Sequence, residues 1–262
     1  MKQALIIGST VADVTVRLPH LPVTGEDVIV ESQSMSLGGC AYNVSEILRQ
    51  SGVPYTLFSP VGTGIYGNYV REHLKRKQIP ILIPAPAADN RCCYCFVEDT
   101  GERSFISYHG AEYLFEKEWF SLIPLEDIDS VYICGLEIEE TTGENIVEFL
   151  EAHKELTVYF APGPRLTVIN PKLVERLYRL SPVLHLNETE ALSASGKSNI
   201  QDAAAFLYTQ TNNTVIITLG EKGCFFFDGK ESDTISPVPA VQADTIGAGD
   251  SHIGSVIACL KK

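Results

Sequence analysis

The sequence has no apolar run that approaches the roughly 20 residues a membrane-spanning helix needs. Its first residues, MKQALIIGS, hold one lysine before an apolar stretch too short for a secretion signal, so we expect a cytoplasmic protein. Positive charge is also scarce, since 20 Lys and Arg stand against 33 Asp and Glu, for a net charge of −13 over 262 residues. We therefore expect neither a nucleic acid nor a membrane as a partner, because phosphate backbones are bound by clustered basic side chains.

Zinc-binding patterns and the dinucleotide fingerprint are missing as well. Cys92, Cys93 and Cys95 stand close together, but no second Cys or His pair follows at zinc spacing, and we expect reduced, structural thiols. The six histidines share no spacing, so we predict surface or structural roles for them. The first predicted strand is followed by GSTVAD instead of GxGxxG, which argues against an NAD-dependent oxidoreductase.

The sequence does contain apolar runs of strand length that alternate with amphipathic segments. Seven runs are rich in Val, Ile and Tyr, mostly end at Gly, Pro or Asn, and are predicted as buried strands: 4–9, 55–62, 79–84, 130–135, 157–162, 182–187 and 214–220. Segments 40–52 and 141–154 repeat apolar residues at helical spacing. This alternation predicts an α/β fold with a mostly parallel sheet and a ligand site beyond the carboxyl ends of its strands.

Residues 14–36 and 92–108 break the alternation. Both regions alternate side chains along a strand, the second contains the hairpin-like DTGE, and no helix intervenes. We predict a small antiparallel sheet, inserted into a single domain over residues 1–262, that covers a site as a lid or forms a dimer surface. An edge hairpin without a function is the alternative.

The stretch DTIGAGDSHIGSVIACL (244–260) sets glycines directly before an apolar, helix-like segment. Gly247, Ala248 and Gly249 have little or no side chain, so their backbone N–H groups can approach a ligand oxygen at the positive end of the helix dipole. Asp250, in the first turn, is placed to accept a proton from a hydroxyl beside that anion. This arrangement suits phosphoryl transfer to a hydroxyl group. A simple helix cap with closely packed glycines explains the run equally well, and the motif alone leaves both open.

Five further short segments follow one another along the chain: GSTVAD (8–13), LGGCAYN (37–43), GLEIE (135–139), LNETEAL (186–192) and ITLGEKG (217–223). Together with DTIGAGD they resemble the ribokinase-like, or PfkB, carbohydrate kinases over nearly the whole chain. The resemblance implies a ribokinase-like three-layer sandwich with a small β lid, and a sugar kinase that uses ATP, Mg²⁺ and a monovalent cation such as K⁺. Relatives normally continue past the last helix, so we expect the C-terminal part of the usual domain to be absent and the nucleotide side to be less enclosed.

The resemblance also implies roles for individual residues. The catalytic set is the base Asp250 with the phosphoryl-stabilising amides of Gly247, Ala248 and Gly249. The sugar-binding set is Asp13, Gly38, Gly39, Asn43 and, as a weaker match, Glu137. The nucleotide-binding set is Asn187, Thr218, Gly220 and Gly223. The metal-binding set is Glu190, for Mg²⁺ through water, and Asp244 and Ile246, for the monovalent cation.

The acceptor stays open at this point. A free pentose or hexose phosphorylated on a primary hydroxyl is our expectation, although GGCAYN lacks the lysine of the GGKGAN found in ribokinases proper. A nucleoside is the alternative, because Tyr94, Phe96, Phe105 and Tyr108 in the lid could stack on a base, and a catalytically silent sugar-binding relative is a further one. Relatives commonly have an aspartate near Ala161, and no consequence is predicted. We expect a homodimer through the lid.

Overall fold

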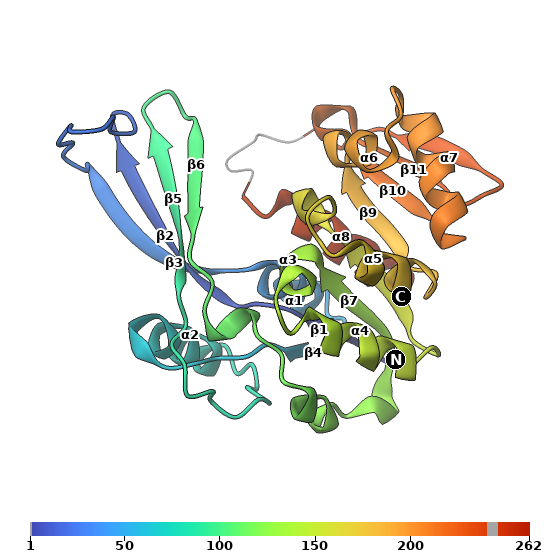
Figure 1. Cartoon of the computed structure of the whole chain (residues 1–262), viewed down its shortest axis with the longest axis horizontal. Coiled ribbons are helices and arrows are strands. Elements are labelled where there is room, and N and C mark those ends of the chain that lie inside the picture. The colour runs from blue at the N-terminus through green and yellow to red at the C-terminus, as the bar shows by residue number, and fades with distance from the viewer. Residues whose placement is uncertain (1, 240–245) are drawn as a thin grey trace.

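The computed structural model of the chain describes residues 2–239 and 246–262. Its main body is built on an eight-stranded sheet in the order β12-β11-β10-β9-β8-β7-β1-β4 (Figure 1). Six neighbouring strands run parallel: β1 (Gln3–Ile7), β4 (Tyr55–Phe58), β7 (Ile128–Cys134), β8 (Thr157–Ala161), β9 (Val183–Asn187) and β10 (Val215–Thr218). Two strands add an antiparallel edge: β11 (Cys224–Phe227) and β12 (Ser232–Ile235). The predicted mostly parallel sheet is confirmed.

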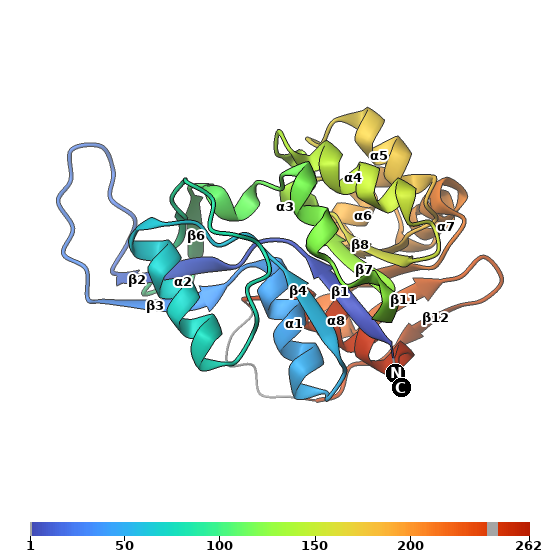
Figure 2. The same cartoon turned by 90° about the horizontal axis from the view of Figure 1, so that it is seen from below.

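The parallel strands are buried on both faces, which explains why their sequences are continuously apolar. In β7, Val131 and Ile133 face one hydrophobic core while Tyr132 and Cys134 face the other. Three helices cover the second core: α1 (Cys40–Gln50), α2 (Gly64–Arg76) and α8 (Ala248–Leu260). Five cover the first: α3 (Gly135–Glu139), α4 (Gly143–Ala152), α5 (Pro171–Tyr178), α6 (Glu188–Ser195) and α7 (Ile200–Thr211). Figure 2 shows α1 and α8 together on one face of the sheet and the α4–α7 group on the other.

One predicted strand, 79–84, is wrong. The segment IPILIP has no regular structure, although Ile79 and Ile83 are almost fully buried. Its apolar residues serve the two cores, but Pro80 and Pro84 lack the N–H groups that a central strand must donate.

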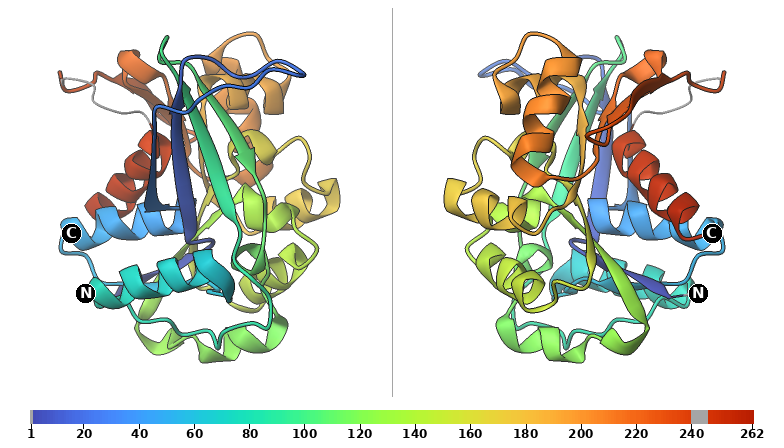
Figure 3. Two further views of the ribbon diagram at one scale, coloured as in Figure 1. Left: turned by 90° about the vertical axis from the view of Figure 1, so that its left-hand side faces the viewer. Right: turned by 90° about the vertical axis from the view of Figure 1, so that its right-hand side faces the viewer.

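A separate four-stranded sheet, called the lid below, projects from one side of the main body (Figures 1 and 3). Its strands, in spatial order, are β3 (Ser32–Gly38), β2 (Val11–Leu18), β5 (Cys92–Glu98) and β6 (Arg103–Ser107). The outer pairs are antiparallel hairpin-like pairs, and a parallel pairing of β2 with β5 joins them. On one lid face Val14 and Val16 pack with Tyr66 and Tyr69 of α2. The other face carries Asp13 and is turned toward the site.

Candidate active site

The glycine-rich run forms the leading end of α8. Gly247 is the N-cap with φ of 70°, a left-handed conformation that glycine adopts without strain. Gly247 has no side chain that could cap this turn, so the first N–H groups of α8 need another partner, such as water or a ligand. A Cβ built on Gly249 would meet no heavy atom within 4 Å outside its own part of the helix. Close packing therefore does not explain Gly249, and Gly247, Ala248 and Gly249 line a cavity in which an anion could meet the start of the helix.

Asp250 lies in the first turn of α8 and is held by a residue of α1. Asn43 donates a hydrogen bond from Nδ2 to Asp250 Oδ2 over 2.9 Å, although 207 positions separate the two residues. Burial raises the pKa of Asp250 to about 6, and the bond from Asn43 works against that rise. The carboxylate is thus mostly ionised at neutral pH and fixed in orientation, as a general base must be.

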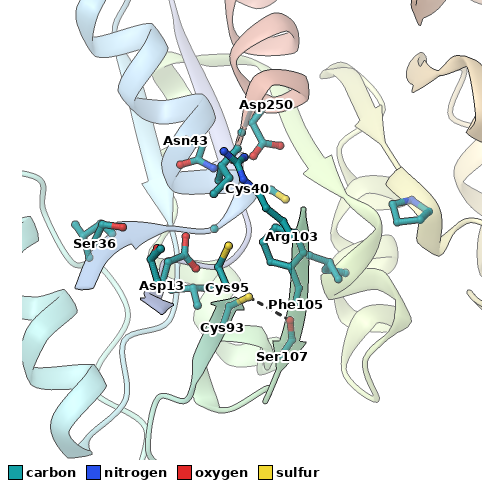
Figure 4. A pocket seen from close by; sticks show the side chains of 18 of the residues that line it. Asp13, Ser36, Cys40, Asn43, Cys93, Cys95, Arg103, Phe105, Ser107 and Asp250 are labelled. Carbon is teal, nitrogen blue, oxygen red and sulfur yellow. Dashed lines mark hydrogen bonds between the residues drawn. The ribbon is translucent and has the colours of Figure 1, made fainter. Parts of the chain in front are cut away.

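Asp13 reaches the same region from β2, and Gly38 makes room for its carboxylate. A Cβ on Gly38 would overlap the Asp13 carboxylate, and one on Gly39, whose φ is 93°, would strike the carbonyl group of Ser9. A side chain at Gly38 would displace the Asp13 carboxylate, and one at Gly39 would shift the backbone at Ser9. Burial first, and the charge of Asp250 second, raise the pKa of Asp13 to about 6. Both carboxylates lie in one pocket (Figure 4).

Two adjoining cavities meet at Asp250. The larger, of about 1160 Å³, lies between the lid and the main body, with Asp13 and Ser36 among its lid residues. The smaller, of about 280 Å³, is lined by Asn187 and Thr218 at the carboxyl ends of β9 and β10. Five residues line both cavities: Cys40, Pro164, Glu190, Gly247 and Asp250. A carboxylate at such a junction can act on two ligands that enter from different sides.

The sequence profile of the pfkB family carbohydrate kinases matches residues 1–262. This chain belongs to the PfkB family. The relative named "Uncharacterized sugar kinase YegV" from Escherichia coli K12 is 30% identical over 99% of this chain and 82% of its own length. The solved ribokinase of Giardia lamblia has a TM-score of 0.85 at 23% identity, covering 100% of this chain and 84% of its own. For Arabidopsis thaliana ribokinase, solved with ribose and ATP, the TM-score is 0.79 at 19% identity, with 99% and 86% covered. The predicted family, kinase class and ribokinase-like fold are confirmed.

The segment LNETEAL forms the start of α6. Glu190 N donates to Asn187 Oδ1 over 2.8 Å, and Asn187 N donates in return to Glu190 Oε2 over 3.0 Å. This reciprocal pair is a capping box, so a structural role is present whatever else the residues do. Glu190 also lines both cavities, and burial raises its pKa. Its carboxylate is an oxygen donor of the kind that Mg²⁺ takes, commonly through water.

The structure describes three of the four remaining residues for which the sequence predicted nucleotide or cation binding. Gly220 and Gly223 line a third, mostly apolar groove of about 610 Å³ that runs along α8 beside Phe226 and Val256. Ile246 lines the larger cavity. Asp244 lies outside the residues that the structure describes.

Glu137 does not reach either cavity. It is 1% exposed, its Oε1 accepts a hydrogen bond from Ser9 N over 2.7 Å, and its Oε2 accepts one from Cys134 Sγ over 2.6 Å. These bonds fix the turn that leads from β1 to β2. Glu137 therefore holds the backbone near the cavity in place. The position of Glu137 does not support the predicted direct contact with a sugar.

The lid aromatics do not all face the site. Neighbouring strand residues point to opposite faces, and Tyr94, which lies 3.1 Å from Tyr66 through their hydroxyl groups, packs with Phe96 on the α2 side. Arg91 lies over the ring of Tyr108. Phe105 alone of the four predicted aromatics lines the cavity, so the stacking argument for a nucleoside is weaker than the sequence suggested.

Two features of the site were not foreseen from the sequence. His185 Nε2 and His252 Nδ1 lie 2.9 Å apart, and burial lowers the pKa of His185 to about 3, so this pair is neutral. His185 lines the smaller cavity, as does Ala161. Cys40 lines both cavities beside Asp250. The position of His252 two residues after Asp250 was the only sequence signal, and nothing marked Cys40 apart from its place in GGCAYN.

Within the described ranges, the structure has no helix long and apolar enough to cross a membrane.

Proposed function

We propose that the protein transfers the γ-phosphoryl group of ATP to a primary hydroxyl of a small sugar, a pentose or a hexose. The observation that carries the proposal is the junction of the two cavities, where the Asp250 carboxylate and the bare amides of Gly247 to Gly249 share the leading end of α8. An acceptor in the larger cavity and a terminal phosphate in the smaller one would meet at that point.

The residues divide the work between proton transfer and charge stabilisation. Asp250 accepts the proton of the acceptor hydroxyl, and Asn43 holds its carboxylate in the required orientation. The amides at the head of α8 stabilise the negative charge that builds up on the transferred group, because they are fixed before the reaction begins. The lid covers the larger cavity and keeps water away from the transferred group.

The residues present fit a magnesium–nucleotide ligand. Gly249 lines the smaller cavity and has open space where a side chain would begin, and Glu190 offers an oxygen donor at the edge of both cavities. When bound, Mg²⁺ and ATP supply the phosphoryl group and neutralise part of its charge. Glu190 would hold the ion through water, and Thr218 would line the phosphate path. The predicted K⁺ site at Asp244 and Ile246 stays a prediction.

A polyol is the acceptor that the larger cavity suits best. Asp13, Asn43 and Ser36 present carboxylate, amide and hydroxyl groups to it, and such paired donors and acceptors reject analogues that lack a hydroxyl. The ribose bound by the A. thaliana ribokinase supports this choice. A nucleoside is the second candidate, favoured by the volume of the larger cavity and by Phe105 and Tyr113 on its wall.

The remaining expectations from the sequence stay proposals. We propose a homodimer through the lid, where Ile106 and Tyr108 are 60% and 59% exposed, and small-angle scattering that shows a monomer at high concentration would count against it. We also propose a cytoplasmic location.

Release of ADP across a panel of pentoses, hexoses and nucleosides tests the proposal, with Asp250→Asn as the matched control. We expect turnover with at least one sugar and its loss in the variant. Tight sugar binding without ADP release would instead identify a catalytically silent relative.

A further inference from the structure

Positive charge is almost absent around the two cavities. Among residues 2–239 and 246–262, Arg103 is the one Lys or Arg that lines either of them. Within the same ranges, four carboxylate side chains line them: Asp13, Glu102, Glu190 and Asp250. A nucleotide with several phosphates would bring more negative charge to this acidic surface, and the amides of α8 can neutralise only part of it.

Arg103 belongs to the lid and stands on its inner face. It is the first residue of β6 and pairs with Val97, which pairs in turn with Arg17 of β2. Residues in one such row share a face of the sheet, and so do residues two apart along a strand. Asp13 is four residues from Arg17 along β2, so Arg103 shares its face but lies about 13 Å nearer the lid tip at about 3.3 Å per residue.

The side chain of Arg103 lines the larger cavity. Figure 4 shows it running from β6 into the pocket, with its guanidinium end directed toward Asn43 and Asp250. Glu190, Gly247 and Asp250 form the wall of the larger cavity on the side of the main body. The lid arginine thus faces the place where the two cavities join.

We propose that Arg103 binds the terminal phosphate of the nucleotide at the junction of the two cavities. A guanidinium group matches this role because it stays charged and can donate two parallel hydrogen bonds to phosphate oxygens. The lid then contacts the nucleotide that donates the phosphoryl group as well as the sugar that accepts it. This inference rests on the proposed kinase function.

Calorimetric titration of the full chain with Mg-ATP, and separately with AMP, tests the assignment. Charged hydrogen bonds of this kind are worth about tenfold or more in affinity, so Arg103→Gln should weaken Mg-ATP binding by at least about tenfold. AMP has no terminal phosphate at that position, and its affinity should stay within about twofold. Arg103→Lys keeps the charge without the planar fork and should fall between the wild type and the Gln variant.

Arg17→Gln is the matched control. Arg17 stands in the same lid row as Arg103 but lines neither cavity, and its replacement by glutamine removes the same charge. It should bind Mg-ATP as the wild type does. Equal Mg-ATP affinity of Arg103→Gln and the wild type would overturn the assignment and leave the kinase function standing. Equal losses in the two variants, or a rise confined to the KM for the acceptor, would also overturn it. A wild type that binds no Mg-ATP would instead remove the proposed function itself.

Discussion

Replacement of Gly249 by alanine separates the two explanations of the glycine-rich run. A Cβ there would contact nothing outside its own part of α8, and alanine is favoured over glycine in a helix by up to about 1 kcal/mol. The variant should therefore unfold at the same temperature as the wild type or a few degrees above it. The added methyl group stands on the wall of the smaller cavity, where the proposal places a phosphate oxygen. Loss of one charge-assisted hydrogen bond, worth about 1.5–3 kcal/mol, predicts a fall in kcat/KM of roughly 10- to 150-fold.

Thermal unfolding and steady-state ADP release on the same preparations measure both quantities. Gly38→Ala is the contrasting control, because its Cβ would overlap the Asp13 carboxylate and both stability and activity should fall. A Gly249→Ala protein with normal activity would refute the phosphate cradle. A variant that loses stability along with activity would favour the packing explanation instead.

Three further predictions concern the carboxylates. A pKa of about 6 in place of 3.8 means that the charge on Asp250 lowers the stability of the folded protein as pH rises through this range. The free energy of unfolding of Asp250→Asn should therefore exceed that of the wild type by up to about 3 kcal/mol at pH 8, by less at pH 5.5, and not at all below the unfolded pKa. Equal unfolding free energies at pH 8 would contradict this. The rate of ADP release should rise with pH through about 6 and then level off. Glu137→Gln should move the midpoint of this pH profile to a lower pH, since the Glu137 charge helps to raise the pKa of Asp250. An unchanged midpoint would contradict that coupling. Glu190→Gln keeps one oxygen for the capping bond from Asn187 N but loses the acceptor of the bond from Asn187 Nδ2, so it should cost about 1 kcal/mol in unfolding. It should also raise the Mg²⁺ concentration needed for half-maximal rate, and a rate curve identical to that of the wild type would remove Glu190 from the metal site.

Much of the fold could be predicted because a strand buried on both faces is continuously apolar. The same rule failed at 79–84, where Ile79 and Ile83 are buried in a segment whose prolines exclude it from the sheet. It also missed β11 and β12, which are four residues long, and of which β12 is the exposed edge strand of the sheet. A short edge strand has little burial to mark it in a sequence.

The sequence predicted which residues belong to the site, but it did not predict which of them contact one another. The motifs identified Asp250 and Asn43 as members of one site, but only the packing of α1 on α8 brings Nδ2 and Oδ2 within 2.9 Å. Strand alternation alone was enough to assign Cys93 and Tyr94 to opposite lid faces, although which face meets the site depends on how the lid joins the main body. Arg103 belongs to no motif, and its role follows from the position of its strand beside the cavity.

Single-turnover transfer from ATP labelled in the γ-phosphate tests the central claim most directly, with wild type and Asp250→Asn compared at saturating Mg-ATP. The account predicts label on an acceptor sugar with the wild type. It predicts a loss of at least about 100-fold in the variant, with Mg-ATP binding undiminished. Transfer at the wild-type rate by the variant, or no labelled sugar from the wild type across pentoses and hexoses, would contradict it.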